Sequence, residues 1–268
     1  MNHLLKTNLD RINTQGVELS FEQILDQGFK SWKKITLPVA GIFLLFAIFI
    51  PVLFIAFLPL IYGVSIGEFM DVAQSNPQYF QEQATSINGL IGTHAFTLII
   101  MLAFTPIPVG IMKMAYCAMV DKPVVFSDAF SFYKAPYYFK LIGFTLLFSF
   151  LPSLLFSALG LIATPLVYLS YLVNIFVAIF LIFVPALIAF GDASIMEAIK
   201  ISIKVASQKV GLIIGIILIS ALFQLLGAIA CCIGMLFTIS FVYSIQMSLY
   251  RDIFMQGDTD NGPESSLE

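Results

Sequence analysis

The sequence SIMEAIKISIKVASQK (residues 194–209) decides how this chain is organised, because a charged segment with helical periodicity leads directly into an uncharged apolar run. Two further segments have the same layout, SFEQILDQGFKSWKK (residues 20–34) and VFSDAFSFYKAPYYFK (residues 125–140). Each has an early acidic or amide residue, an apolar stripe and a lysine near its end. We therefore expect three amphipathic helices that lie in the membrane interface on the cytoplasmic side.

The three segments align as copies of one unit. One column holds acids or an amide, and the next holds small or apolar residues: Gln23, Asp128 and Glu197, followed by Ile24, Ala129 and Ala198. Ser194 and Glu197 fit a helix capping box, as do Ser20 and Gln23, whereas the middle copy has Val125 in the cap position. The pattern predicts an internal triplication, with units at about residues 20–119, 120–190 and 191–256.

The composition indicates a polytopic membrane protein. Of the 268 residues, 59% are hydrophobic and only 11% are charged, which is far from the composition of soluble domains. Uncharged or nearly uncharged runs cover residues 35–67, 90–112, 141–190 and 210–250. Because a crossing needs about 20 residues, the first two runs each fit one span and the last two each fit a pair. We expect an all-α fold with six transmembrane helices in three hairpins, each preceded by an interfacial helix.

The chain outside these units is polar. Residues 1–19 read as a polar lead-in, and residues 257–268 as an acidic, disordered tail. The first apolar run is too long for a signal peptide and has no small-residue cleavage site, so we expect it to stay in the protein. Residues 20–256 then form a single membrane domain.

The basic residues are sorted by side. With six spans, all thirteen Lys and Arg residues fall on one side of the membrane. The only long polar connection on the other side, residues 62–89, carries Glu68, Asp71 and Glu82 but no Lys or Arg. The positive-inside rule then places both termini in the cytoplasm.

Three segments of the last third resemble a bacterial superfamily of six-helix membrane proteins. They are FVPALIAFGDASIMEAIKIS (residues 183–202), CIG (residues 232–234) and YRD (residues 250–252). The superfamily includes the membrane domain of some glycerophosphodiester phosphodiesterases and several families of unknown function. The resemblance implies the fold and a place in the bacterial inner membrane. It transfers no catalytic site, because the phosphodiesterase barrel is a separate domain that this chain lacks.

Small and polar residues recur on single faces of the expected spans. The serines and glycines have the spacing that lets helix backbones approach closely, and the amides need a partner in hydrocarbon. Two readings stay open, helix packing and a polar permeation path along a seam. The residues are Ser149, Ser153, Ser157, Gly211, Gly215, Gln224, Ser240, Ser244, Gln246 and Ser248, with Asn174 as a further amide.

The sequence has no recognisable catalytic, cofactor-binding or metal-binding pattern. No Asp, Glu, Lys or Arg lies deep in an expected span, which argues against an ion-coupled pump. No Ser/His/Asp set, HExxH motif or P-loop is found, and Cys117, Cys231 and Cys232 show no metal or disulfide spacing. We expect neither an enzyme nor a cofactor, and nothing favours nucleic-acid binding.

Lysines beside aromatic residues suggest contacts with lipid headgroups, although membrane topology alone also explains them. The candidates are Trp32, Lys33, Lys34, Lys134, Lys140, Lys204 and Lys209. The favoured function is a non-enzymatic membrane scaffold or accessory module that interacts with lipids, with a membrane-protein partner or with its own copies. The alternative is a channel or facilitator for a neutral or lipidic substrate.

Overall fold

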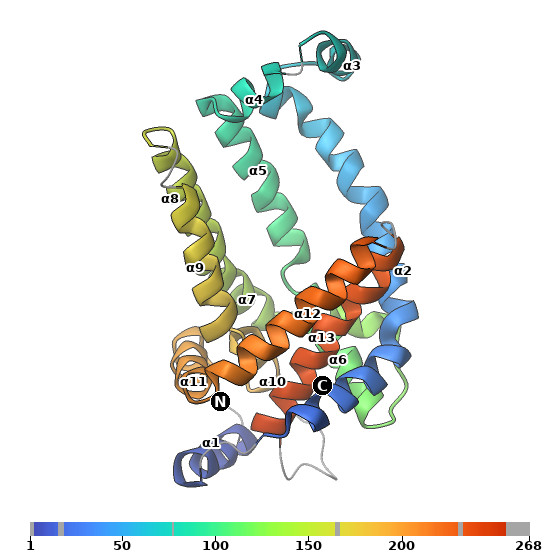
Figure 1. Ribbon diagram of the computed structural model, residues 1–268, viewed down its shortest axis with the longest axis vertical. Helices are drawn as coiled ribbons and strands as arrows, with labels where there is room; N and C mark the ends of the chain where they lie inside the picture. The colour runs from blue at the N-terminus through green and yellow to red at the C-terminus, as the bar shows by residue number, and fades with distance from the viewer. Residues whose placement is uncertain (1–2, 16–18, 77, 164–166, 230–232, 256–268) are drawn as a thin grey trace. The chain divides into compact units, whose positions relative to one another are not determined.

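The computed structural model describes residues 3–15, 19–76, 78–163, 167–229 and 233–255, and these residues form helices and no strand (Figure 1). The expected all-α class is confirmed. The elements are α1 (His3–Gln15), α2 (Phe21–Tyr62), α3 (Ile66–Ser75), α4 (Gln78–Ala84), α5 (Ile87–Phe104), α6 (Ile107–Met119), the 3₁₀ helix η1 (Phe126–Tyr133), α7 (Tyr137–Thr145), the π-helical turn η2 (Leu146–Phe150), α8 (Leu151–Gly160), α9 (Val167–Phe180), α10 (Val184–Phe190), α11 (Ile195–Gln208), α12 (Val210–Ile229) and α13 (Ile233–Phe254).

Four stretches of the described chain are long and apolar enough to cross a membrane, so the chain is a multi-helix membrane protein. They are Phe21–Tyr62, Ile87–Met119, Tyr137–Gly160 and Val210–Ile229. Helices α9 and α10 add a fifth crossing if they form one span, although they meet at a bend of 44°. The expected sixth helix, α13, is not among these candidates. Its sequence includes Thr238, Gln246 and Arg251, which lower its hydropathy.

The helices divide into two compact units. Unit 1 contains residues 1–43, 106–144 and 176–268, and unit 2 contains residues 44–105 and 145–175. In unit 1, α12 and α13 lie side by side, and α13 also packs on α6 and α1 (Figure 1). In unit 2, α5 packs on α4 and α8.

Helix α2 is continuous from Phe21 to Tyr62, so the prediction of a separate interfacial helix over residues 20–34 is wrong at its C-terminal boundary. The reason is a buried stripe that runs from the amphipathic part into the apolar part without changing face. Ile24, Ile35, Val39 and Ile42 are all fully buried at helical spacing. Both parts therefore share one buried face, as a single helix requires.

The middle copy is not one helix either. Residues 125–140 form η1, which ends at Tyr133, and α7, which begins at Tyr137. Pro136 lies between them, and proline at this position removes a backbone donor and restricts the residue before it. Val125 N–H donates to Asp128 Oδ2 at 3.3 Å, so this copy makes the half of a capping box that does not depend on the side chain at the cap position.

Helix α11 matches the prediction for residues 194–209. Ser194 Oγ accepts from Glu197 N–H at 3.4 Å, and Glu197 Oε2 accepts from Ser194 N–H at 3.0 Å, which completes the capping box. The aligned residues Gln23, Asp128 and Glu197 lie in the first turn of α2, η1 and α11. The residues that follow them, Ile24, Ala129 and Ala198, are each fully buried.

The two apolar runs that each fit a pair of spans are divided at places partly outside the described residues. Within residues 141–190, α8 ends at Gly160 and α9 begins at Val167, and residues 164–166 are not described. Within residues 210–250, α12 ends at Ile229 and α13 begins at Ile233, and residues 230–232, which include Cys231 and Cys232, are not described. The tail from residue 256 onward is likewise not described.

Candidate functional site

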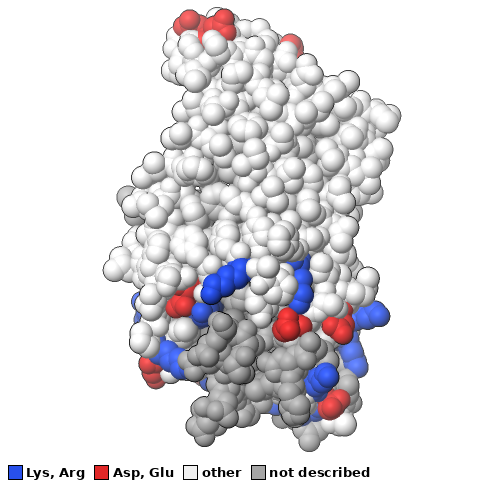
Figure 2. Space-filling view, turned by 180° about the vertical axis from the view of Figure 1, so that it is seen from behind, with Lys and Arg blue, Asp and Glu red and all other residues white. Residues whose placement is uncertain are grey.

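All thirteen basic residues belong to unit 1, and unit 2 contains none. The charges of unit 2 are Glu68, Asp71 and Glu82, which lie in α3 and α4. On the face shown in Figure 2, the Lys and Arg side chains of unit 1 gather in one band with Asp and Glu between them. The charged band of unit 1 is therefore the first candidate for a functional surface.

One lysine of this band binds the end of a helix. Lys34 Nζ donates to the carbonyl of Ala118 at 3.0 Å and to Asp121 Oδ1 at 2.6 Å, directly after α6. A cation at this place compensates the unpaired carbonyls and the negative end of the helix dipole. The hydrogen bond and the charge of Lys34 hold the pKa of the Asp121 carboxyl below its ordinary value.

A second lysine repeats the arrangement at α10. Lys140 Nζ contacts Asp192 Oδ1 at 2.9 Å, two residues after the helix ends at Phe190. Asp121 and Asp192 both adopt a left-handed backbone conformation, with φ of 55° and 47°. Short polar side chains tolerate this conformation better than most residues. The backbone after α6 and the backbone after α10 thus share a left-handed aspartate that pairs with a lysine.

An arginine does the same at α13. Arg11 Nη2 donates to the carbonyl of Ile253 at 3.0 Å, in the last turn of α13. Three helices of unit 1 therefore each have a basic side chain from elsewhere in the sequence at their C-terminal end. Lys34, Lys140 and Arg11 thus have partners within the protein.

Lys113 joins η1 to α6. Its Nζ lies 3.1 Å from Asp128 Oδ1 and donates to Ser131 Oγ at 3.0 Å, and both charged side chains are at most one-fifth exposed. The two elements cross at backbone contact, because a Cβ at Gly110 would overlap the Ala129 backbone. This ion pair and the close crossing fix η1 on α6.

The remaining lysines divide by exposure. Lys33, Lys134 and Lys200 are exposed, Lys209 is half-buried, and the structure shows no ion pair or hydrogen bond from their amines to another described residue. Lys204 is also exposed. Lys33, Lys134, Lys200 and Lys209 lie in the three predicted interfacial segments, whereas Lys6, which is also exposed, lies on α1.

Aromatic side chains accompany Lys134. Phe126, Phe130, Tyr133, Tyr138 and Phe139 form a continuous row in which successive ring centroids are 5.4–5.9 Å apart. Phe126, Phe130 and Phe139 are exposed. Burial raises the pKa of Tyr133 to about 12, so its hydroxyl keeps its proton at neutral pH. Exposed aromatic rows of this kind are typical of membrane interfaces.

Trp32, in contrast, packs within unit 1. Its indole N–H donates to the carbonyl of Phe237 at 2.9 Å, and its ring lies edge-on to Phe29 and Phe223. Phe223 stacks in turn against Phe241 at 4.3 Å. This side chain therefore joins α2 to α12 and α13.

The serine face of α13 is fully buried. Ser248 Oγ donates to the carbonyl of Ile24 at 3.0 Å, and Ser240 Oγ donates to that of Phe237 at 2.8 Å. Ser244 is also buried, and its hydroxyl is the one buried side-chain polar atom without a hydrogen-bond partner in the described residues. A Cβ at Gly28 of α2 would meet Ile245 at 3.3 Å, which shows how closely the two helices approach. This half of the predicted seam is packed helix against helix.

The other predicted seam residues differ in their surroundings. Gln224 accepts from Thr238 Oγ1 at 3.0 Å, so this amide makes the interhelical bond expected of it. Gly215 lies near the Phe21 ring, whereas a Cβ added at Gly211 would have no neighbour within 4 Å. Asn174 is exposed and bonds the Ser170 carbonyl of its own helix instead of a partner helix. Ser149, Ser153, Ser157 and Gln246 are half-buried.

Ser202 has a role that sequence reasoning missed. It is fully buried in α11, donates to the Phe180 carbonyl at 2.8 Å and accepts from Phe183 N–H at 3.3 Å. These backbone groups flank the 44° bend between α9 and α10. Serine and threonine side chains commonly satisfy backbone groups that a helix break leaves unpaired. The serine alone carries no signal for this in sequence, because its partners are about 20 residues away.

No protein-family model matches the chain, and no significant match was found among curated proteins or solved structures.

Proposed function

We propose that this protein is a non-enzymatic, multi-pass module of the bacterial inner membrane that holds anionic lipid headgroups at the basic surface of unit 1. The observation that carries the proposal is the division of the basic residues into two groups. Lys34, Lys113, Lys140 and Arg11 have partners within the protein, whereas Lys33, Lys134 and Lys200 are exposed without one. The second group is available to lipid phosphates.

The surroundings of these lysines favour a lipid over a soluble anion. The exposed rings of Phe126, Phe130 and Phe139 lie in the same segment as Lys134, and they would be costly to leave in water. Each lysine near an anionic membrane surface contributes about 1 kcal/mol of attraction. At an anionic membrane surface, the aromatic rings would leave water at headgroup depth and the amines would bind the lipid phosphates.

The topology belongs to the same proposal. Six spans in three hairpins, built by triplication, with both termini in the cytoplasm, would place every basic residue on the inner side. The repeated exit from α6 and α10 supports it, since Asp121 and Asp192 each bind the last lysine of the preceding copy, Lys34 and Lys140. This topology also fits the six-helix superfamily that the sequence resembles. Self-association or a membrane-protein partner is compatible with it.

The experiment compares lipid binding by the purified protein and a variant with Lys33, Lys134, Lys200 and Lys209 changed to Gln. Native mass spectrometry with phosphatidylglycerol and phosphatidylcholine should show an at least ~10-fold loss of affinity for phosphatidylglycerol alone. Lys30→Gln is the matched control, because Lys30 is exposed but paired with Asp26 on the same helix. Equal phosphatidylglycerol binding by wild type and the fourfold variant would sink the proposal.

A channel or facilitator along the serine seam is the weaker alternative. Ser240 and Ser248 are fully buried and hydrogen-bonded to main-chain carbonyls, which favours helix packing on this side of the seam. Solute flux into liposomes that Ser240→Ala or Gln246→Ala abolishes would restore the alternative and displace the lipid-module proposal.

A further inference from the structure

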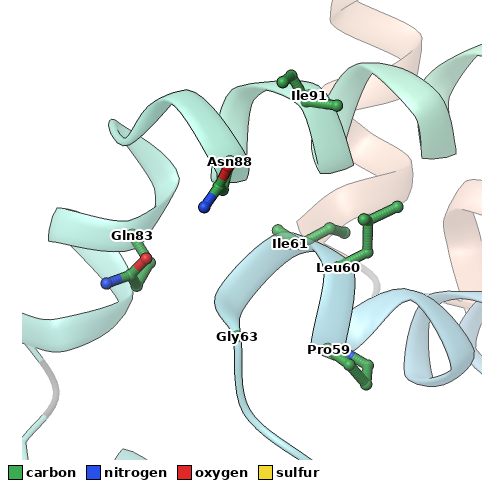
Figure 3. Close-up of a pocket in the computed structure, with 7 residues that line it drawn as sticks. All are labelled: Pro59, Leu60, Ile61, Gly63, Gln83, Asn88 and Ile91. Atoms are coloured by element: carbon green, nitrogen blue, oxygen red, sulfur yellow. The ribbon is translucent and has the colours of Figure 1, made fainter.

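Unit 2 contains a pocket of about 240 Å³ between the C-terminal end of α2 and the segment from α4 to α5 (Figure 3). None of its lining residues is charged. One wall is apolar, and the opposite side contributes two side-chain amides. The lining consists of Pro59, Leu60, Ile61, Gly63, Gln83, Asn88 and Ile91.

At two glycines of α5, the backbones of the helices around this pocket are in direct contact. A Cβ at Gly92 would lie 2.7 Å from the Leu60 carbonyl oxygen and 2.8 Å from Ile61 Cα. A Cβ at Gly89 would overlap the Gln83 carbonyl. Helix α5 therefore touches both α2 and α4 through its main chain. The distance between the two sides of the pocket is set by these contacts and not by flexible side chains.

The two amides have hydrogen-bonding capacity to spare. The structure shows no hydrogen bond from the side-chain amide of Gln83 or Asn88 to another described residue. In Figure 3 the Asn88 side chain points from α5 into the gap above Ile61 and Gly63. Each amide can donate two hydrogen bonds and accept others. A ligand with neutral acceptors, such as carbonyl oxygens, would use both.

The volume fits part of a larger molecule. Pockets that enclose a whole drug-sized ligand measure about 300–1,000 Å³. This pocket is smaller than that range, and it opens beside Leu60 and Ile91, which are both exposed. A ligand that fills it would leave apolar chains outside, along these two residues.

The depth of the pocket in the membrane follows from α5, which lies wholly in unit 2. From Ile87 to Phe104 this helix carries no Asp, Glu, Lys or Arg, and it rises by about 27 Å at 1.5 Å per residue. This length is close to the ~30 Å thickness of the hydrocarbon core of a bilayer. The N-terminal end of α5 and the pocket beside it then lie where acyl chains join polar headgroups.

We propose that this pocket binds the glycerol-ester region of a diacyl phospholipid. The ester carbonyls accept hydrogen bonds from Asn88 Nδ2 and Gln83 Nε2, and the acyl chains lie along Leu60 and Ile91. Because the lining carries no charge, the pocket recognises the ester linkage and not the charge of the headgroup. The site is separate from the lysines of unit 1 and goes beyond the function proposed for them.

The test uses the full chain purified in detergent and two lipids that differ only in linkage, dioleoyl phosphatidylcholine and its diether analogue. Native mass spectrometry gives the dissociation constant of the first bound lipid. Loss of a neutral hydrogen bond corresponds to roughly 2- to 10-fold in affinity. We expect the wild type to bind the diester more tightly by about this factor, and Gln83→Leu/Asn88→Leu to bind both lipids equally.

Two further variants keep the test decisive. Gln81→Leu, an exposed amide on α4 outside the pocket, should retain the preference for the diester. Ile91→Phe fills the pocket without removing an amide and should weaken binding of both lipids. Wild-type protein that does not distinguish the two lipids, or a double variant that still does, would overturn the proposal. Phosphatidylcholine is not anionic, so either result leaves the lysine proposal untouched.

Discussion

Lys34 and Asp121, 87 residues apart in the sequence, form an ion pair of 2.6 Å at the C-terminal end of α6. The same amine binds the Ala118 carbonyl, so Lys34, a residue of α2, caps the C-terminal end of α6. The pair is a structural contact within unit 1.

Replacing Lys34 should therefore cost stability. We expect Lys34→Met to lower the free energy of unfolding by about 1 kcal/mol, because the Ala118 carbonyl at the end of α6 loses its hydrogen-bond partner. Thermal unfolding of the detergent-solubilised protein measures this. Lys30→Met is the control, since its i,i+4 pair with Asp26 is exposed and such pairs contribute only about 0.3–0.5 kcal/mol. Equal effects of the two substitutions would contradict the assigned role of Lys34.

Ser202→Ala should destabilise the bend between α9 and α10. The substitution leaves the Phe183 N–H and the Phe180 carbonyl without their partner in a buried place, at a cost of about 1–3 kcal/mol. Hydrogen exchange of the amide of Phe183 should accelerate in step with the loss of stability. Ser207→Ala, which removes an exposed hydroxyl from the same helix, should change neither quantity.

Gly110 and Gly211 should respond in opposite ways to the same methyl group. At Gly110 the new Cβ overlaps the Ala129 backbone, so Gly110→Ala should cost about 1–3 kcal/mol or more and loosen η1 from α6. At Gly211 nothing lies within 4 Å of the new Cβ, and alanine is the better helix former by up to about 1 kcal/mol. Unfolding midpoints of the two variants, measured side by side, check the contrast.

The contribution of the α11 capping box to stability should depend on pH through the Glu197 carboxyl. Hydrogen bonds from the backbone and side chain of Ser194 hold the pKa of Glu197 below its ordinary value. A carboxyl whose pKa is lower in the folded state stabilises the fold above the unfolded pKa, and the contribution is lost as pH falls through the folded pKa. Stability measured from pH 7 to pH 3 should therefore fall less steeply in Glu197→Gln, which keeps a box without a titrating group. Identical slopes would show that this box does not contribute.

Local patterns predicted the parts of the fold that neighbours in sequence determine. The capping box of Ser194 and Glu197 depends on residues three positions apart, and the structure has it. The break within residues 125–140 was not predicted although Pro136 is visible in the sequence, because the alignment with the other two copies favoured a single helix there.

Contacts between distant residues could not be predicted in the same way. Nothing local pairs Arg11 with Ile253 or Ser202 with Phe180, since the partner in each case is a main-chain carbonyl that every residue possesses. The lysines illustrate the same limit. Lys34 and Lys33 are neighbours in sequence and both are exposed, yet Lys34 binds the end of α6 and Lys33 has no partner among the described residues.

The contact between Arg11 and Ile253 has a consequence for biosynthesis. Arg11 and its acceptor Ile253 are 242 residues apart, so this hydrogen bond can form only after nearly the whole chain has been translated. The ion pairs of Lys34 and Lys140 can form earlier, because their carboxylates follow 87 and 52 residues later in the sequence. Chains truncated before α13 should therefore leave α1 undocked, and attachment of the N-terminal helix should be among the last events in the assembly of unit 1.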